Sequence, residues 1–124
     1  MEPNSAFRVL IVDDEKPVAD SLAMVFSAAG YEARAAYSAE DAAETISQWE
    51  PRLAILDVVL PGMNGIDFAI QLETSCPQCQ VLLFSGDQST ANLVQEALAK
   101  GRDFKILAKP VHPSFFLEKA AQLC

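Results

Sequence analysis

The feature of this sequence that most constrains its fold is a regular alternation between short apolar runs and longer segments with helical spacing. Runs such as VLIV, LAIL and VLLF are continuously apolar, as expected of strands that are buried on both faces. Between them, apolar residues recur at intervals of three and four, and Gly30 supplies a stop after the first such segment. This alternation predicts right-handed crossovers and a parallel sheet covered by helices on both faces.

Five strand and helix pairs account for nearly the whole chain, so we expect a single α/β domain spanning residues 1–124. The expected strands are 7–14, 31–37, 52–57, 80–85 and 104–108, and the expected helices are 16–30, 38–50, 65–76, 89–101 and 113–124, the second of them closing before Pro51. Ser38 is the expected N-cap of the second helix, with Asp41 three residues later.

Charge and hydropathy exclude several classes of protein. Seventeen acidic against nine basic side chains give a net charge of −8, and the basic residues form no patch. Direct nucleic-acid binding is therefore not expected, because affinity for a duplex depends largely on neutralising phosphates. No apolar run approaches the roughly 18 to 20 residues that cross a bilayer, and the N-terminus does not resemble a signal peptide. We expect a cytoplasmic protein with no membrane partner.

The cysteines do not form a recognisable disulfide framework, because there are only three of them. Cys76 and Cys79 form a CPQC pair, which could indicate a metal or redox site. Zinc takes about four ligands, however, and His112 is the only histidine. Redox pairs of this spacing favour a helix N-terminus, whereas this pair follows an expected helix. A functional role for the pair is therefore the less favoured interpretation.

Polar side chains follow four of the expected strands: Asp13 and Asp14, then Asp57, then Ser85, and finally Lys109. Because parallel strands end at one edge of a sheet, we expect these groups to lie together. Three adjacent carboxylates raise one another's pKa unless a cation intervenes. An all-oxygen donor set favours a hard cation, Mg²⁺ or alternatively Mn²⁺. With the ammonium and hydroxyl groups nearby, the set predicts phosphoryl transfer.

Asp57 occupies the most informative of these positions. It ends a buried apolar run and is followed by the turn sequence PGMNG, which would hold the carboxylate rigidly and leave its outer side open. Gly62 and Gly65 are expected to serve turn geometry. Taken singly, Asp13 and Asp14 could equally be acids at a helix N-terminus; only the combination of strand-end residues indicates a metal site.

These motifs resemble those of the receiver domain of two-component response regulators. VDDE follows the first strand, LDVVLPGMNG surrounds the end of the third, FSG follows the fourth and AKP the fifth. Each motif alone is common, but their order at successive strand ends is specific, and the resemblance covers essentially the whole chain. It implies a flavodoxin-like (βα)5 three-layer sandwich with a five-stranded parallel sheet in the order 2-1-3-4-5.

The resemblance also implies roles for residues around the metal. Asp57 would accept a phosphoryl group from a sensor histidine kinase, a phosphotransfer protein or a small phosphodonor. Asp14 and Asp57 would bind Mg²⁺ through their side chains, Val59 through its backbone carbonyl, and Asp13 mainly through water. Family members often carry a polar group at the position of Val59, where it positions hydrolytic water, so we expect this chain to lose its phosphate more slowly.

The same resemblance describes a switch. Lys109 would contact the phosphoryl oxygens, a cis bond before Pro110 would aim that lysine, and Ser85 would move toward the phosphoryl group. Partners would then bind an altered face made by the fourth helix, fifth strand and fifth helix. The family usually carries Tyr or Phe where this chain has Ile106, with Phe104 two residues earlier, so the usual aromatic read-out is not expected.

Other functions remain open at this level. A phosphatase of the haloacid dehalogenase type also uses an Asp nucleophile and Mg²⁺, but this chain has Val59 where such enzymes have a second Asp. A phosphorylation-independent interaction module would not need the complete set of strand-end residues. A flavodoxin would need a phosphate-binding loop that is absent after the first strand. We therefore expect a switch that turns over no separate substrate, whose cognate kinase, output and dimer state the sequence does not identify.

Overall fold

The computed structural model describes residues 7–86, 95, 98, 99, 101, 106–109 and 111–123. Its strands are β1 (Arg8–Val12), β2 (Glu32–Ala36), β3 (Leu53–Asp57), β4 (Gln80–Ser85) and β5 (Ile106–Ala108). Its helices are α1 (Lys16–Ala28), α2 (Ala39–Ile46), α3 (Gly65–Ser75) and α5 (Pro113–Leu123). The helix expected over 89–101 falls largely outside the described residues, of which Gln95, Leu98 and Ala99 are helical.

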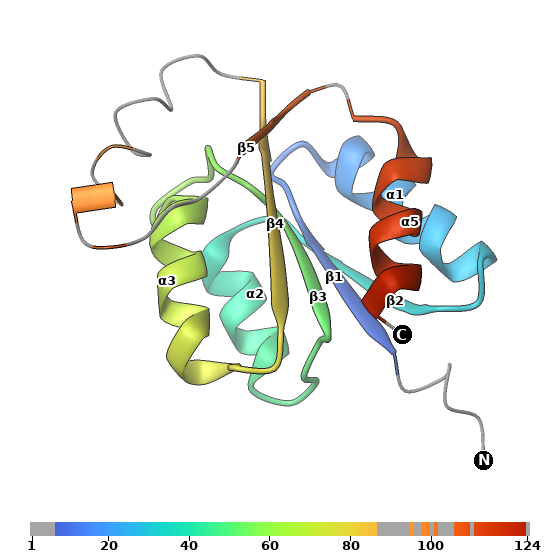
Figure 1. Cartoon of the computed structure of the whole chain (residues 1–124), viewed down its shortest axis with the longest axis horizontal. Coiled ribbons are helices and arrows are strands. Elements are labelled where there is room, and N and C mark those ends of the chain that lie inside the picture. Colours follow the sequence, from blue (N-terminus) through green and yellow to red (C-terminus); the bar gives the residue numbers. More distant parts are fainter. Residues whose placement is uncertain are drawn as a thin grey trace.

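The strands form one parallel sheet in the order β2-β1-β3-β4-β5, so the predicted topology is confirmed. Helices α2 and α3 cover one face of this sheet, and α1 and α5 cover the other (Figure 1). The chain is therefore a three-layer α/β sandwich. Among the described residues, no helix is both long enough and apolar enough to span a membrane.

The core is divided by the sheet into two clusters. Alternate residues of the central strands point to opposite faces: Leu10 and Leu56 pack on the side of α2 and α3, whereas Val9 and Ile55 pack on the side of α1 and α5. Every residue of β3 is buried, which explains its continuous apolar run. Its position at the centre of the sheet makes the end of β3 a rigid platform.

The second helix is shorter than expected. Ser38 does cap it, accepting a hydrogen bond from the backbone N–H of Asp41 at 3.0 Å, but α2 ends at Ile46, whereas the helix was expected to continue to the residue before Pro51. Beyond the helix the chain turns so that Trp49 becomes buried and its indole donates a hydrogen bond to Glu32 at 3.2 Å. Burial of this ring thus overrides the local helical pattern.

Trp49 is also flanked by two guanidinium groups. Those of Arg8 and Arg34 lie 5.5 and 4.8 Å from its ring centroid, and Arg8 pairs with Glu32 at 2.9 Å. Arg8 and Glu32 begin β1 and β2, which are paired in register there. The cluster therefore covers the start of these strands, at the end of the sheet opposite to their carboxyl termini.

Candidate functional site

The strand ends bring the expected site residues to one edge of the sheet. Asp13 follows β1, Asp57 is the last residue of β3, Ser85 is the last residue of β4, and Lys109 follows β5. Backbone hydrogen bonds extend beyond the strands here, from Asp13 N–H to the carbonyl of Ala36 at 3.1 Å and from Lys109 N–H to the carbonyl of Ser85 at 3.0 Å. The sheet itself therefore fixes the backbone from which these side chains project.

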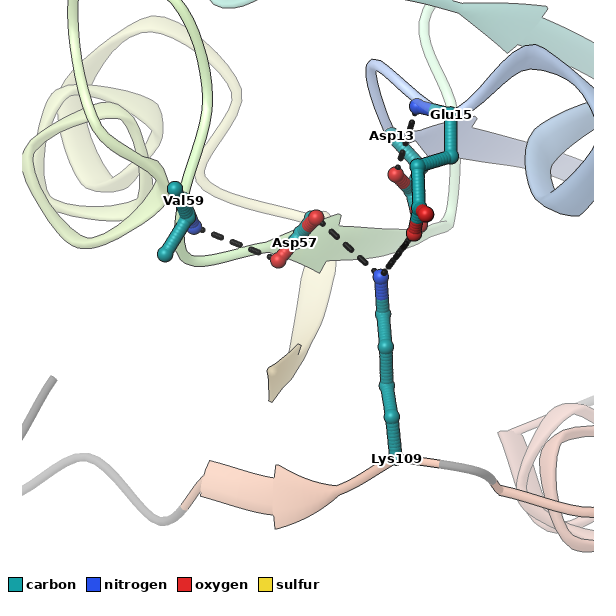
Figure 2. Close-up of polar contacts among 5 residues, drawn as sticks. All are labelled: Asp13, Glu15, Asp57, Val59 and Lys109. Carbon is teal, nitrogen blue, oxygen red and sulfur yellow. Dashed lines mark hydrogen bonds and ion pairs between the residues drawn. The ribbon is translucent and has the colours of Figure 1, made fainter. Parts of the chain in front are cut away.

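Lys109 reaches from β5 across the edge of the sheet into a group of carboxylates (Figure 2). Its Nζ lies 2.8 Å from Asp13 Oδ2, 3.2 Å from Asp57 Oδ2 and 3.2 Å from Glu15 Oε1. The ammonium also lies 4.8 Å from the ring centroid of Phe84, a favourable distance for a cation and an aromatic face. These contacts hold one positive charge between the ends of β1 and β3.

The carboxylates form the kind of donor set that a hard cation requires. Ligand atoms of Asp13, Asp14 and Asp57 all lie within 4.8 Å of one another. Asp13 and Asp57 are buried, whereas Asp14 is exposed. Because all three offer oxygen, and because two of the three cannot spread apart into solvent, the residues fit Mg²⁺ or Mn²⁺ rather than a softer metal.

Burial is the main reason that the pKa of Asp57 is raised from its ordinary value of 3.8 to about 6. The negative charge of Asp13 raises this pKa further, while Lys109 and a hydrogen bond from the backbone N–H of Val59 to Asp57 Oδ1, at 3.2 Å, lower it. For Lys109, burial alone would lower the pKa, but hydrogen bonds and charges from Asp13 and Asp57 outweigh it and raise the pKa. The lysine is therefore an ammonium at neutral pH.

The raised pKa of Asp57 predicts that Asp57→Asn stabilises the protein when divalent metal is absent. The folded state binds a proton at Asp57 more tightly than the unfolded chain, so stability is lost as the pH rises from about 4 to about 6. Removing the ionisable group should raise the free energy of unfolding at about pH 7.5 by at most roughly 3 kcal/mol. Chemical denaturation with EDTA at about pH 4 and pH 7.5 measures this; an equal difference between variant and wild type at both pH values would contradict it.

An open cavity of about 410 Å³ lies over these groups. Its lining combines acids, the lysine and the end of β4: Asp14, Glu15, Asp57, Val59, Ser85, Gly86 and Lys109. Val59 stands at the edge of the cavity with 43% of its surface exposed, and its side chain offers no hydrogen-bonding group. The cavity has room for a phosphate-sized anion beside the carboxylate of Asp57.

Gly65 begins α3 directly against the end of β3. Its N–H donates to the carbonyl of Val58 at 2.8 Å. A Cβ at Gly65 would clash with the carbonyl oxygen of Asp57 and lie 2.9 Å from its carbonyl carbon. Gly62 has a φ of +74°, so the prediction of a turn role is confirmed there. Gly65 was expected to serve a turn, but glycine is required there because the start of α3 lies too close to the backbone of Asp57 to leave room for a side chain.

The structure brings Asp13, Asp14, Asp57, Ser85 and Lys109 to one edge, as the spacing of the motifs predicted. Ser85 is buried and lines the cavity with its neighbour in the chain. The sequence interpretation missed Glu15 as a third partner of Lys109; its position directly after the two aspartates in VDDE was the available signal.

Of the expected switch residues, the structure describes Ile106, the first residue of β5. Ile106 is half-buried and packs against the core cluster on the side of α2 and α3. Phe104 and Pro110 lie outside the described residues, so the expected cis bond stays a prediction.

Comparison with known proteins identifies the family and the fold. A family model described as a response regulator receiver domain matches residues 9–121. A solved receiver domain protein (CheY-like) from Methanospirillum hungatei JF-1 is 31% identical, with 94% of this chain and 91% of that chain covered and a TM-score of 0.80.

Two more distant structures were solved with ligands or a modification. The response regulator protein TrrA from Thermotoga maritima, in complex with Mg(2+)-BeF, is 23% identical, with 95% of this chain and 99% of that chain covered and a TM-score of 0.76. A response regulator from Burkholderia pseudomallei, with a phosphorylated aspartic acid, calcium ion and citrate, is 22% identical, with 94% and 70% covered and a TM-score of 0.77. At these identities the likeness concerns the fold.

Proposed function

We propose a phosphoacceptor function for this chain, which belongs to the response regulator receiver domain family of two-component systems. Asp57 is the proposed acceptor, and residues 1–124 are proposed to act as one receiver domain. The observation that carries the proposal is the contact of Lys109 Nζ with Asp57 Oδ2 at 3.2 Å, beside the clustered carboxylates and under an open cavity.

Asp57 has the properties of a positioned nucleophile. Its Oδ1 accepts a hydrogen bond from Val59 N–H, and its Oδ2 accepts one from Lys109. A pKa of about 6 leaves the carboxylate ionised at neutral pH while making it more basic than an ordinary aspartate. One oxygen would attack the phosphorus of a phosphohistidine or an acyl phosphate, and the bond to the leaving imidazole or carboxylate would break with its electron pair.

Lys109 and Ser85 would stabilise the acquired charge. Phosphorylation adds about −1.5 to −2 charge at neutral pH, and the lysine is the cation already in contact with Asp57. The ammonium would exchange part of its contact with the carboxylates for the phosphoryl oxygens, and the Ser85 hydroxyl would donate to them. This movement at the ends of β4 and β5 is the proposed start of the switch.

Asp14 and Asp57 would hold Mg²⁺ or Mn²⁺ through their side chains, Val59 through its backbone carbonyl and Asp13 through water. Both oxygens of Asp13 already accept hydrogen bonds, from Lys109 at 2.8 Å and from Glu15 N–H at 2.9 Å, which supports an indirect role for this residue. When bound, the metal would neutralise charge on the transferred phosphoryl group.

The proposed phosphoryl donor is a sensor histidine kinase or a phosphotransfer protein, in the cytoplasm. The proposed output is altered binding of a downstream effector at the face that includes β5 and α5, together with the helix expected over 89–101. No separate substrate would be turned over. Direct nucleic-acid binding by this segment is not part of the proposal, in keeping with its net charge of −8.

Incubation with acetyl phosphate and Mg²⁺ tests the proposal. Intact mass spectrometry should show one added phosphoryl group, and none when EDTA is present in place of Mg²⁺. Fragmentation after stabilisation of the acyl phosphate should place the group at Asp57. Steady hydrolysis of p-nitrophenyl phosphate at an enzymatic rate would instead favour a phosphatase. A phosphoryl group on another residue, or none with a histidine kinase or any small donor, would overturn the assignment.

Val59→Asn is expected to accelerate loss of the phosphoryl group. The exposed isopropyl group of Val59 cannot hold a water molecule at the acceptor, whereas an amide can donate to and accept from one. Orienting the attacking water should raise the autodephosphorylation rate by roughly tenfold. The rate is measured by decay of the phosphorylated mass after the donor is removed, with Val59→Leu as the apolar control. An unchanged rate for Val59→Asn would count against this role.

A further inference from the structure

Residues 76–79 connect α3 to β4 at the end of the sheet opposite to the proposed phosphorylation site. β4 runs from Gln80 to Ser85, so its first residue follows Cys79 and its last residue lines the cavity. The N–H of Cys79 donates to the carbonyl of Cys76 at 3.0 Å, which closes a four-residue turn with Pro77 in its second position. Such a turn keeps the outer Cα atoms within about 7 Å, close to the separation of roughly 4.4 to 6.8 Å that disulfides span.

The two cysteine side chains also lie on the same side of the sheet. Cys76 belongs to the core cluster on the side of α2 and α3, and Cys79 packs against that cluster. Each thiol makes a long hydrogen bond to a backbone carbonyl, from Cys76 Sγ to Pro51 at 3.7 Å and from Cys79 Sγ to Gln80 at 3.4 Å. A thiol is a weak hydrogen-bond donor, so losing these two hydrogen bonds when a disulfide forms costs little free energy.

We propose that Cys76 and Cys79 are a modification site, closing an intramolecular disulfide when the chain meets a peroxide or a glutathione-type disulfide. The half-buried Cys79 is the more accessible thiol, since Cys76 is 2% exposed. With hydrogen peroxide, the Cys79 thiolate breaks the O–O bond to give a sulfenic acid and water, and the Cys76 sulfur then displaces a second water. With an oxidised glutathione, two exchange steps release two glutathione thiols.

A metal site is the weaker alternative for this pair. Among the described residues, the carboxylates of Asp13, Asp14 and Asp57 are the only group of three or more potential ligands that lie close enough together to share an ion. The pair alone offers two sulfurs, whereas zinc takes about four ligands. Covalent closure needs only the two sulfurs that the turn brings together.

The surroundings of the pair distinguish it from catalytic dithiols. Burial raises the pKa of both thiols, that of Cys79 to about 12, and the turn follows the C-terminal end of α3, whose dipole disfavours a thiolate. Both attack by these thiols and their departure as leaving groups are therefore slow. The disulfide would form slowly and persist once formed. This differs from the rapid redox chemistry of a pair at a helix N-terminus, the role that the sequence disfavoured.

The test uses the full chain carrying Cys124→Ser, so that only the turn cysteines remain. The folded protein is exposed to hydrogen peroxide or oxidised glutathione, then denatured and alkylated with N-ethylmaleimide. Its intact mass is then measured by mass spectrometry. The expected product has lost two hydrogen atoms, takes up no alkylating agent and regains both thiols after treatment with dithiothreitol. Proteolysis without reduction should yield one peptide that carries both Cys76 and Cys79 and has lost two hydrogen atoms, which assigns the disulfide to this pair.

The matched control adds Cys79→Ser, at the more accessible position, and should yield no intramolecular loss of hydrogen. Oxidation of the Cys124→Ser protein in guanidinium chloride shows whether the oxidant can form the Cys76–Cys79 disulfide in the denatured chain. The proposal is overturned if the folded protein keeps two alkylatable thiols under conditions that fully oxidise the denatured chain. Acetyl phosphate labelling of Asp57 should be unchanged by oxidation, so this outcome is independent of the proposed phosphoacceptor function.

Discussion

Replacing Asp57 by asparagine is expected to reduce phosphoryl incorporation from acetyl phosphate by roughly a thousand-fold or more. The amide is nearly the same size as the carboxylate, so the buried position at the end of β3 stays filled. It lacks the anionic oxygen that attacks phosphorus. Lys109 keeps its 2.8 Å contact with Asp13, so the cation stays near its place. Intact mass after incubation with Mg²⁺ and the donor measures the effect.

Asp20→Asn provides the matched control for this loss. Asp20 is an exposed carboxylate on α1 whose oxygen accepts a hydrogen bond from the Tyr37 hydroxyl at 2.6 Å, and an asparagine keeps an oxygen for that bond. This variant should incorporate one phosphoryl group like the wild type. Incorporation by Asp57→Asn at the wild-type level would remove Asp57 from its proposed role.

Gly65→Ala is expected to destabilise the fold by about 3 kcal/mol and to impair phosphorylation together with it. The added methyl group would clash with the backbone of Asp57 and would also lie 3.0 Å from the Cα of Val58. Neither is the flexible end of a side chain, so α3 or the end of β3 must shift. The free energy of unfolding comes from chemical denaturation followed by circular dichroism, and phosphorylation is compared where both proteins are folded.

Gly86→Ala is the corresponding control, because Gly86 also lines the cavity. Its added Cβ would meet the side chain of Lys109 at 3.6 and 3.7 Å, which is ordinary van der Waals contact. Its stability should change by no more than about 0.5 kcal/mol. If Gly65→Ala were as stable as Gly86→Ala and the wild type, the close approach of α3 to β3 would not be the reason for glycine at position 65.

The strands and the edge of the sheet were predictable because their signals are local. Continuous apolar runs set β1, β3 and β4, and parallel topology then places whatever follows each run at a common edge. This is why Asp57 and Lys109 could be paired from positions far apart in the chain. The order of the strands came from the family resemblance, since periodicity alone does not determine it.

The features that were missed depend on contacts between distant segments. The early end of α2 reflects burial of Trp49 against side chains of β1 and β2, which a helical pattern cannot register. Gly65 looked like a turn residue because it stands in the PGMNG loop, and the loop sequence does not show that the chain folds back to bring Gly65 against the carbonyl of Asp57. The raised pKa of Asp57, by contrast, follows from causes that the sequence indicated, namely burial at the end of an apolar run and the charge of Asp13 at the same edge of the sheet.

The burial of Trp49 has a practical consequence for measuring these variants. It is the only tryptophan in the chain, and it lies against the start of β1 and β2, remote from the edge that would bear the phosphoryl group. Its intrinsic fluorescence should therefore change when the sheet comes apart and release the ring to water, yet stay constant while the acceptor is modified. Trp49 fluorescence can therefore report the unfolding of each variant independently of its phosphorylation.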